Sequence, residues 1–373
     1  MIKCVVWDLD NTLLAGTYLE SDPGCRPGAD PVLLGVLREL AARGIVHAIA
    51  SRNPPEAAAY AARLTGTQFA AAQCGWDAKP DAISRIIADL GFGADSVAFV
   101  DDDPLERAEV AAALPAVLVL SPEDAAGAGS WPQFSPAVVT PEGRRRSEMY
   151  AQRRLRQEQA QAFAGSRAEF LRRSGTRLLI GAATAADVPR LHELSVRTHQ
   201  FNSAGRQVSQ QDLAELVSSA GHRVITLRLS DRFGDDGTVG GCVVQTGPAP
   251  AWTAPLLMMS CRAMGRGVID ALLAWLCQAA AAAGAGLVRV PCRLSERNVP
   301  LRVALAAAGF RAEHTAAGDA GGETAAAASA VAASAVPVSA VFSRALTGSL
   351  PDLPEWAADR TLSVPGVTDG TAR

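Results

Sequence analysis

Residues 3–13, KCVVWDLDNTL, combine the pattern of a buried strand with a group of polar side chains at its end. A continuous, valine-rich apolar run is typical of a parallel strand that is covered on both faces. Strand and helix patterns alternate from here to residue 135, which predicts a doubly wound α/β domain over residues 1–135. In such a sheet, ligands bind beyond the carboxyl ends of the strands.

The other elements of this domain follow from local signals. Asp30 and Pro31 begin a helix pattern that ends before Gly44, as the preferences of helix ends predict. Further helices are predicted at 54–65, 80–90 and 104–113, and further strands at 45–51, 96–101 and 116–120. Because the strands are parallel, the residues that follow them meet at one edge of the sheet.

Asp8 and Asp10 follow the first strand, and strand alternation predicts that they point the same way. Two carboxylates this close repel each other unless a cation lies between them, and Mg²⁺ is the hard cation that oxygen ligands favour. Taken alone, the DxDxT pattern is also compatible with a turn and a helix cap. Ser51 ends the second strand, Lys79 precedes a helix, and residues 101–106 follow a later strand, so these groups are expected in one crevice.

This set of motifs resembles the haloacid dehalogenase (HAD) superfamily of phosphotransferases. The resemblance implies that Asp8 is the nucleophile that takes the phosphoryl group and that Asp10 is the general acid/base for the leaving oxygen. It also implies two sets of binding residues, which are Thr12, Ser51, Arg52 and Lys79 for the phosphoryl oxygens and Asp8, Asp10 and Asp102 for Mg²⁺, with Asp101 and Glu106 nearby. The gaps between the motifs are too short for a large cap domain, so we expect an open site.

Residues 136–175 are predicted to form an Arg-rich helical linker. Within them, residues 144–173 hold nine Arg and three Glu, which gives a strong local positive charge. This charge favours either a solvated linker helix or a docking surface for an acidic partner.

A second α/β domain is predicted over residues 176–346, with a disordered insertion at 315–335 and a tail at 347–373. Residues 260–267, SCRAMGRG, lie between a strand pattern and a long helix pattern, where glycine-rich backbone binds phosphate through free N–H groups. The domain resembles the GNAT acyltransferase fold. That resemblance implies a pantetheine-binding loop made by Arg262, Gly265, Arg266 and Gly267, with the arm carried by coenzyme A or by an acyl carrier protein.

Cys261 ends the strand before this loop, where a partly exposed thiol beside a helix start is suited to carry an acyl thioester. A buried structural role is the alternative for this residue. Cys292 on the neighbouring strand is a second candidate, and Cys25 and Cys74 lie in loops. His199, within RTHQFN, is either a general base for the thiol or an ordinary polar surface residue.

The composition excludes several classes of protein. The chain has 373 residues, 49% of them hydrophobic, and a net charge of −3, which argues against global disorder and against nucleic-acid binding. No apolar run is long enough for a membrane span, and the chain opens directly on a strand, so we expect no signal peptide and a cytoplasmic location. The seven cysteines lack CxxC spacing, which favours free thiols in a reducing compartment.

The combined motifs resemble a narrower family, the FkbH-like HAD-type (HAD-IIIC) glyceryl transferase/phosphatases of polyketide biosynthesis. The stretches that carry this resemblance are KCVVWDLDNTL, FVDDDPLERAEV, RRRSEMY, RTHQFN and MSCRAMGRGV. It implies a Mg²⁺-dependent bifunctional enzyme that removes phosphate from D-1,3-bisphosphoglycerate and loads the glyceryl unit onto an acyl carrier protein, as a precursor of polyketide extender units or tetronate rings. Two alternatives stay open, a HAD phosphatase fused to a coenzyme A-dependent acyltransferase and a second domain that only docks a carrier protein.

Overall fold

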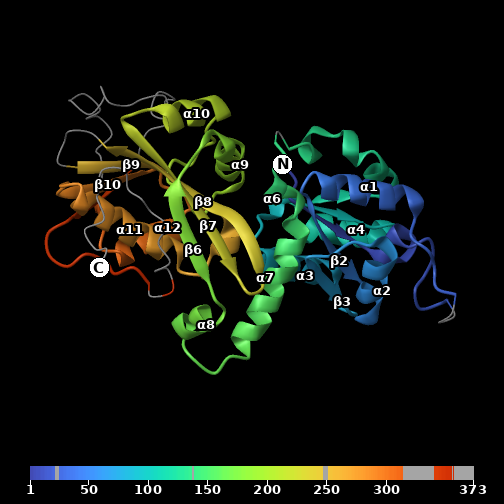
Figure 1. Ribbon diagram of the computed structural model, residues 1–373. Helices are drawn as coiled ribbons and strands as arrows, with labels where there is room; N and C mark the ends of the chain where they lie inside the picture. Colours follow the sequence, from blue (N-terminus) through green and yellow to red (C-terminus); the bar gives the residue numbers. More distant parts are fainter. Residues whose placement is uncertain (22–24, 137, 247–250, 314–339, 355, 357–373) are drawn as a thin grey trace. The chain divides into compact units, whose positions relative to one another are not determined.

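The computed structural model describes residues 1–21, 25–136, 138–246, 251–313, 340–354 and 356. They form two compact units that divide between Gln161 and Ala162, and each unit has its own sheet (Figure 1). The expected insertion at 315–335 and the end of the expected tail lie outside the described residues. Within the described residues, no helix is long and apolar enough to cross a membrane.

The first unit is built on a five-stranded parallel sheet with the strand order β3-β2-β1-β4-β5. Its strands are β1 (Cys4–Trp7), β2 (Val46–Ser51), β3 (Ala71–Cys74), β4 (Val97–Val100) and β5 (Leu118–Leu120). Every residue of β1, β2 and β4 is buried, because helices cover both faces of a parallel sheet. The predicted doubly wound architecture is confirmed, although β3, with the sequence AAQC, was not predicted because it lacks β-branched and aromatic residues.

The helices of this unit lie between and after its strands, and some of them begin at a side-chain cap. They are α1 (Pro31–Ala42), α2 (Glu56–Thr65), α3 (Lys79–Leu90), α4 (Pro104–Ala113) and the short α5 (Pro122–Ala126). The side chain of Asp30 accepts hydrogen bonds from the first turn of α1, and Asp103 does the same for α4. Helices α3 and α4 each begin just beyond a strand, at the carboxyl edge of the sheet. The cap of α4 therefore fixes a loop at this edge.

The predicted linker at 136–175 is wrong as a separate segment. Helices α6 (Pro141–Arg144) and α7 (Arg146–Gln161) belong to the first unit, and Tyr150 packs into its core. Arg146 is also buried, and its Nη1 donates a hydrogen bond to the carbonyl oxygen of Gly44 over 2.8 Å. Helix α8 (Arg167–Arg173) belongs to the second unit. The boundary between the two units falls between α7 and α8. A few apolar side chains are enough to anchor each of these helices to its own unit.

The second unit contains a seven-stranded sheet with the order β11-β12-β10-β9-β8-β7-β6. Its strands are β6 (Arg177–Ala182), β7 (His222–Asp231), β8 (Gly234–Thr246), β9 (Ala251–Met259), β10 (Leu287–Cys292), β11 (Arg311–Glu313) and β12 (Ala340–Ala345). The strands pair antiparallel except for β9 and β10, which are parallel. Its helices are α9 (Val188–Arg197), α10 (Gln210–Ser218), α11 (Val268–Ala282) and α12 (Val299–Ala307), which confirms a second α/β domain.

The beginning of the expected tail is part of the second unit instead. Leu350, Leu353 and Trp356 are partly buried against its main core. The side chain of Gln278 on α11 donates a hydrogen bond to the carbonyl oxygen of Pro351 over 2.9 Å. The described residues beyond 346 therefore pack against the second unit beside α11. The burial of three large apolar side chains offsets the conformational entropy that this segment loses when it becomes ordered.

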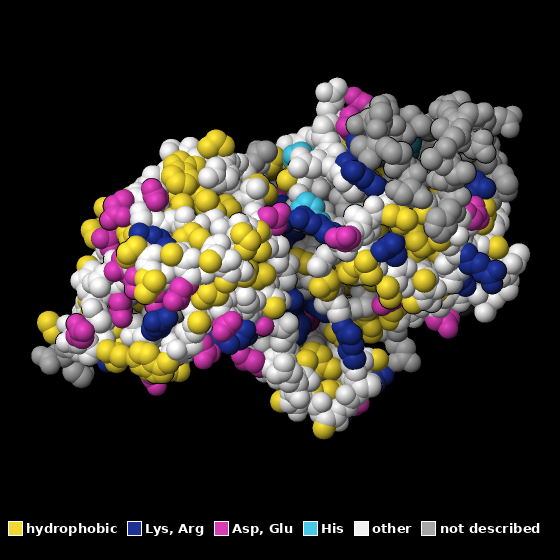
Figure 2. Space-filling model, turned by 180° about the vertical axis from the view of Figure 1, so that it is seen from behind, with side chains coloured by type: hydrophobic (Ala, Val, Ile, Leu, Met, Phe, Trp, Pro, Cys, Tyr) yellow, Lys and Arg dark blue, Asp and Glu magenta, His cyan; other side chains and the backbone are white. Residues whose placement is uncertain are grey.

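Charged side chains are mixed on the surface. On the face that Figure 2 shows, Lys and Arg lie interspersed with Asp and Glu among the described residues.

Candidate functional site

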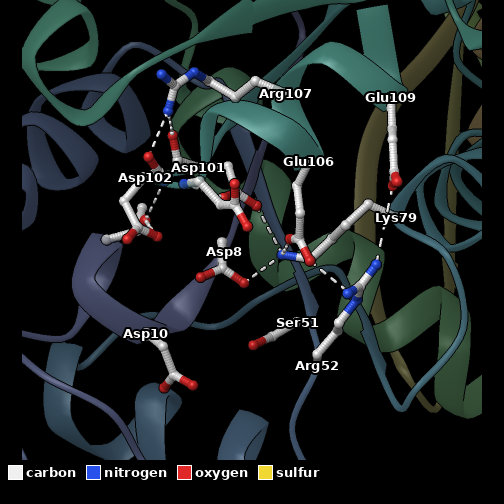
Figure 3. A network of polar contacts seen from close by, with 12 residues as sticks. Asp8, Asp10, Ser51, Arg52, Lys79, Asp101, Asp102, Glu106, Arg107 and Glu109 are labelled. Atoms are coloured by element: carbon white, nitrogen blue, oxygen red, sulfur yellow. Dashed lines mark hydrogen bonds and ion pairs between the residues drawn. The ribbon is translucent and has the colours of Figure 1, made fainter. Parts of the chain in front are cut away.

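Three carboxylates surround one ammonium group at the carboxyl edge of the first sheet (Figure 3). Asp8 follows β1, Asp101 follows β4, Glu106 lies on α4, and Lys79 begins α3. The Nζ atom of Lys79 lies 2.8 Å from Asp101 Oδ2 and 3.0 Å from Glu106 Oε2, and it also pairs with Asp8. All four side chains are buried, with Lys79 only 2% exposed. The topology thus brings together residues that the sequence places nearly a hundred positions apart.

The cluster carries more negative charge than its lysine neutralises. Burial raises the pKa of Asp8 to about 7, although the nearby Lys79 opposes this shift. Burial likewise raises the pKa of Asp101 to about 6. Burial alone would lower the pKa of Lys79, but Asp8 and Asp101 hold it above its usual range. The lysine therefore stays positively charged, and the carboxylates carry negative charge that a further cation would neutralise.

This excess makes the cluster chemically suited to a divalent cation. Asp8, Asp101 and Glu106 each offer a carboxylate oxygen, and these oxygens lie within 4.8 Å of one another. An all-oxygen, anionic donor set is what Mg²⁺ prefers. Of the three metal ligands predicted from the sequence, only Asp8 belongs to this cluster. Asp10 and Asp102 have other partners among the described residues.

Asp102 lies in the bend after β4 and points away from Lys79 (Figure 3). Thr12 Oγ1 donates a hydrogen bond to Asp102 Oδ1 over 3.3 Å and accepts one from the Asp102 N–H over 3.0 Å. Thr12 was predicted to bind phosphate, but this geometry gives its hydroxyl another role. It fixes the loop after β4, which carries Asp101.

Asp10 does not continue the alternation of the strand, because β1 ends at Trp7 and the chain turns at Asn11, whose φ is 49°. Figure 3 shows Asp10 set apart from the group around Lys79. The carboxylate of Asp10 accepts hydrogen bonds from the Tyr18 N–H at Oδ1 and from Asn53 Nδ2 at Oδ2, both over 2.9 Å. Two separate elements therefore hold the predicted acid in one orientation.

Asn53 was missed by the sequence reasoning. It is fully buried, and its Nδ2 donates to Ser51 Oγ over 3.0 Å as well as to Asp10. The available signal was its position two residues after Ser51 at the end of β2, which favours the same side of the chain.

Arg52 lies at the rim of the cluster rather than inside it. Its Nε atom lies 3.0 Å from Glu106 Oε1, and its side chain is 45% exposed. Glu106 therefore bridges Arg52 and Lys79. A cavity of about 50 Å³ adjoins the site and is lined by Ser51, Lys79 and Cys74, among others. The predicted phosphate-binding residues Ser51 and Lys79 thus face a common space.

A second candidate site lies at the glycine loop of the second unit. Gly265 and Gly267 adopt the left-handed φ values of +76° and +68°, and α11 begins directly after them. The loop lines a cavity of about 260 Å³, whose other walls include Met259 and Trp356. Val268 and Ile269, which begin this 15-residue helix, line the same cavity, and ligand binding by the loop stays a prediction.

Arg266 does not present its charge to this cavity, which corrects its predicted role. Its guanidinium is buried and pairs with Asp231 over 2.8 Å and with Asp236. Two carboxylates of the β7–β8 hairpin thus engage it, so it anchors the loop. Arg262 is likewise buried.

Cys261 is partly exposed in a short 3₁₀ turn that follows β9. The segment RTHQFN lies along the end of this strand, because Asn202 forms an antiparallel bridge with Met258 and the Met259 N–H donates to the Phe201 carbonyl oxygen over 2.9 Å. His199 is exposed and lies in the bend and turn that precede this bridge. The structure therefore places the RTHQFN segment beside the end of β9, and a pairing of His199 with Cys261 stays a prediction.

Two of the other candidate cysteines lie in environments that disfavour the thiolate. Cys292 is fully buried, and burial raises its pKa to about 12. Burial also raises the pKa of Cys74, in the small cavity of the first unit, to about 11. Because the thiolate is the reacting form, both environments disfavour acylation.

Comparison with known proteins finds resemblances in structure for separate parts of the chain. No protein-family model and no curated protein matches it. The N-terminal part of the protein BF1531 from Bacteroides fragilis, containing a phosphatase domain complexed with Mg, is 28% identical over 34% of this chain and 38% of that chain, with a TM-score of 0.30. The ribosomal-protein-S18-alanine N-acetyltransferase from Escherichia coli is 12% identical over 46% of this chain and 96% of that chain, with a TM-score of 0.32. In fold, a doubly wound α/β unit with a parallel sheet is followed by a second α/β unit with a mixed sheet.

Proposed function

We propose that the chain is a two-domain enzyme that cleaves a phosphate ester in its first unit and transfers an acyl group in its second. The observation that carries the proposal is the buried group of Asp8, Asp101 and Glu106 around Lys79. Burying several carboxylates is costly, and such perturbed clusters are typical of catalytic sites.

In the first unit, Asp8 attacks the phosphorus atom and displaces the leaving oxygen. The covalent intermediate splits a difficult displacement into two easier steps. Lys79 neutralises charge on the phosphoryl oxygens, Ser51 donates a hydrogen bond to one of them, and Asp10 protonates the leaving oxygen. Bound at the carboxylates, Mg²⁺ would neutralise further phosphoryl charge. Water then releases inorganic phosphate from Asp8, with Asp10 acting as the base.

The finer proposal names D-1,3-bisphosphoglycerate as the substrate and an acyl carrier protein as the acceptor. This compound carries an acyl phosphate and a phosphate ester, so conversion into a glyceryl thioester needs two different cleavages. A thiolate of the second unit attacks the acyl carbonyl. A C–S bond forms, the C–O bond to the phosphate breaks, and inorganic phosphate leaves. The first unit hydrolyses the phosphate ester. The motif resemblance and the partly exposed Cys261 beside the glycine loop support this division.

A phosphatase fused to a coenzyme A-dependent acyltransferase is the second candidate. The GNAT-like sheet and the cavity at the glycine loop favour it, because a pantetheine arm has the same chemistry on either carrier. The two candidates differ in the acceptor that becomes loaded.

The deciding experiment incubates the protein with D-1,3-bisphosphoglycerate and Mg²⁺, with either an acyl carrier protein bearing phosphopantetheine or coenzyme A. We expect the mass of the carrier protein to rise by one glyceryl group while phosphate is released, and EDTA to stop the phosphate-ester cleavage. Loading of coenzyme A alone would support the second candidate. No phosphate release from any phosphate ester would reject the phosphatase assignment itself.

A further inference from the structure

We propose that Asn53 is a positioning residue for the phosphate-cleaving reaction, which holds the leaving-group acid and a phosphoryl-binding hydroxyl in one arrangement. The inference rests on the proposed function of the first unit. It adds a residue that acts through Asp10 and Ser51 rather than on the substrate.

The orientation of the Asn53 amide is set by its partners. Nδ2 lies 2.9 Å from Asp10 Oδ2 and 3.0 Å from Ser51 Oγ. An ionised carboxylate accepts hydrogen bonds and donates none, so the amide must turn its nitrogen toward Asp10. The NH₂ group of Asn53 therefore contacts both Asp10 and Ser51. In the proposed reaction these two side chains act on different atoms of the substrate.

The same contact directs the hydroxyl of Ser51. Because Ser51 Oγ accepts from Asn53, its own O–H is left to donate elsewhere. Ser51 lines the small cavity together with Lys79, which is where a phosphoryl oxygen has to lie in the proposed reaction. Asn53 thus assigns Ser51 the role of donor toward the substrate.

For Asp10, the contact fixes the carboxylate against rotation. Its Oδ1 accepts from the Tyr18 N–H, a backbone group that substitution leaves in place, whereas Oδ2 depends on the side chain of Asn53. Proton transfer requires the donor within hydrogen-bond reach of the leaving oxygen, so a freely turning Asp10 loses efficiency.

Stability alone explains Asn53 poorly. The residue is fully buried, and its Oδ1 has no hydrogen-bond partner among the described residues. An unpaired buried carbonyl oxygen lowers stability, and such exceptions in a fold call for a functional reason.

The test measures how the loss depends on the leaving group. p-Nitrophenolate leaves without protonation, whereas the alkoxide of β-glycerophosphate needs the acid. For Asn53→Ala we expect kcat/KM on β-glycerophosphate to fall by about 10²-fold and kcat/KM on p-nitrophenyl phosphate by less than about fivefold, because kcat/KM reports only the steps up to departure of the leaving group. Asn53→Leu nearly keeps the side-chain size but removes the donor without adding a charge, and we expect the same unequal loss. Because it is nearly isosteric, it remains informative where the alanine variant fails to fold.

A second readout needs no turnover. Calorimetric titration with inorganic phosphate should show weaker binding to both Asn53 variants, because Ser51 is no longer directed. Asn298→Ala is the matched control, since Asn298 is equally buried in the second unit and its Nδ2 donates to the Arg293 carbonyl oxygen. It should leave both readouts unchanged. Equal losses on the two substrates with unchanged phosphate binding would overturn the positioning role, whereas a wild-type protein inactive on both substrates would overturn the proposed function and the inference with it.

Discussion

Lys79 carries the positive charge at the centre of the first site, and its neighbours show how the site balances stability against reactivity. Its ammonium group contacts three carboxylates, which are Asp8, Asp101 and Glu106. Removing one carboxylate relieves repulsion, whereas removing the lysine leaves several buried charges without compensation. Loss of either kind of side chain should remove activity, whereas stability should respond in opposite directions to the two substitutions.

Asp8→Asn is expected to abolish phosphate release without destabilising the first unit. The amide keeps the volume of the side chain but is no nucleophile, so the rate should fall by about 10⁴-fold or more. Lys79 keeps Asp101 and Glu106, so the free energy of unfolding should stay within about 1 kcal/mol of the wild type or rise. Phosphate release and urea unfolding measure the two effects.

Lys79→Met is the contrasting variant for this prediction. It should lose activity and also about 3–5 kcal/mol of stability, since three buried carboxylates lose the cation that they share, although Glu106 keeps its ion pair with Arg52. A near wild-type rate for Asp8→Asn would show that the covalent route is wrong.

His47 offers a pH test of the core beneath the site. It is fully buried, its Nδ1 accepts a hydrogen bond from Trp7 Nε1, and burial lowers its pKa to about 3. Between pH 6.5 and 3 the unfolded chain binds a proton here and the folded chain does not, so stability falls as the pH falls. At pH 5 the loss should be about 2 kcal/mol relative to pH 7.

His47→Gln removes this titration while keeping a possible acceptor for Trp7. Hydrogen exchange of the β1 and β2 amides reads the first unit alone. The wild type should lose about 2 kcal/mol more than the variant between pH 7 and pH 5. Parallel pH curves for the two proteins would mean that His47 becomes protonated in the folded state.

At the residue scale, the sequence predicts the types of side chain at the site better than their partners. Asp8, Ser51 and Lys79 are recognisable because each adjoins a clear strand or helix signal. The choice between Asp101 and Asp102 depends on which way one residue points, and that direction is set by Thr12, far away in the sequence. Such long-range contacts leave no local pattern.

At the scale of elements, helices with strong end signals agree with their predicted bounds within a few residues, α4 among them. Two features required tertiary information. Strand β3 is short and alanine-rich, so only its pairing with β2 makes it a strand. Helix α7 looks solvated because its sequence is polar, yet Met149 and Tyr150 anchor it to the first unit. A narrow apolar stripe is difficult to distinguish from chance in a charged segment.

The arginines of α6 and α7 should therefore fall into two classes, exposed and buried. Arg144 and Arg154 are exposed, and reversing both to Glu should raise the KM for an acidic carrier protein at low salt, because exposed charge acts on association. Phosphate release from a small ester should be unchanged. Arg146→Glu should destabilise the first unit instead, since its guanidinium is buried against Gly44. An unchanged KM for the double variant would leave α7 as a structural helix without a docking role.

At the scale of the whole molecule, the chain combines two units with separate cores and separate candidate sites. The sequence predicts both folds, because alternating strands and helices define each of them. Arg266 shows where the motif reasoning ends, since its buried pairs with Asp231 and Asp236 give it an anchoring role. A glycine pattern predicts the backbone of a loop more safely than it predicts the direction of the side chains within it.

The two sites should accordingly be separable by substitution, and Cys261 is the residue that tests this. A thiolate is able to attack an acyl phosphate without further energy input, and the resulting thioester exchanges with a pantetheine thiol at nearly equal free energy. Cys261 is partly exposed next to the glycine loop, whereas burial raises the pKa of Cys292 to about 12. After incubation with D-1,3-bisphosphoglycerate alone, the wild type should gain a hydroxylamine-labile glyceryl group, visible by intact mass.

Cys261→Ser should show no labile adduct and should fail to load a carrier protein, yet keep metal-dependent hydrolysis of simple phosphate esters. His199→Ala should slow formation of the adduct by about 10²-fold, if it acts as the general base. Cys292→Ser is the matched control, because it changes a buried thiol on the neighbouring strand and should leave the adduct in place. A labile adduct of undiminished yield on Cys261→Ser would move the acyl group to another cysteine, and peptide mapping would then distinguish Cys74 from Cys25, since these two lie in the first unit and are less buried than Cys292.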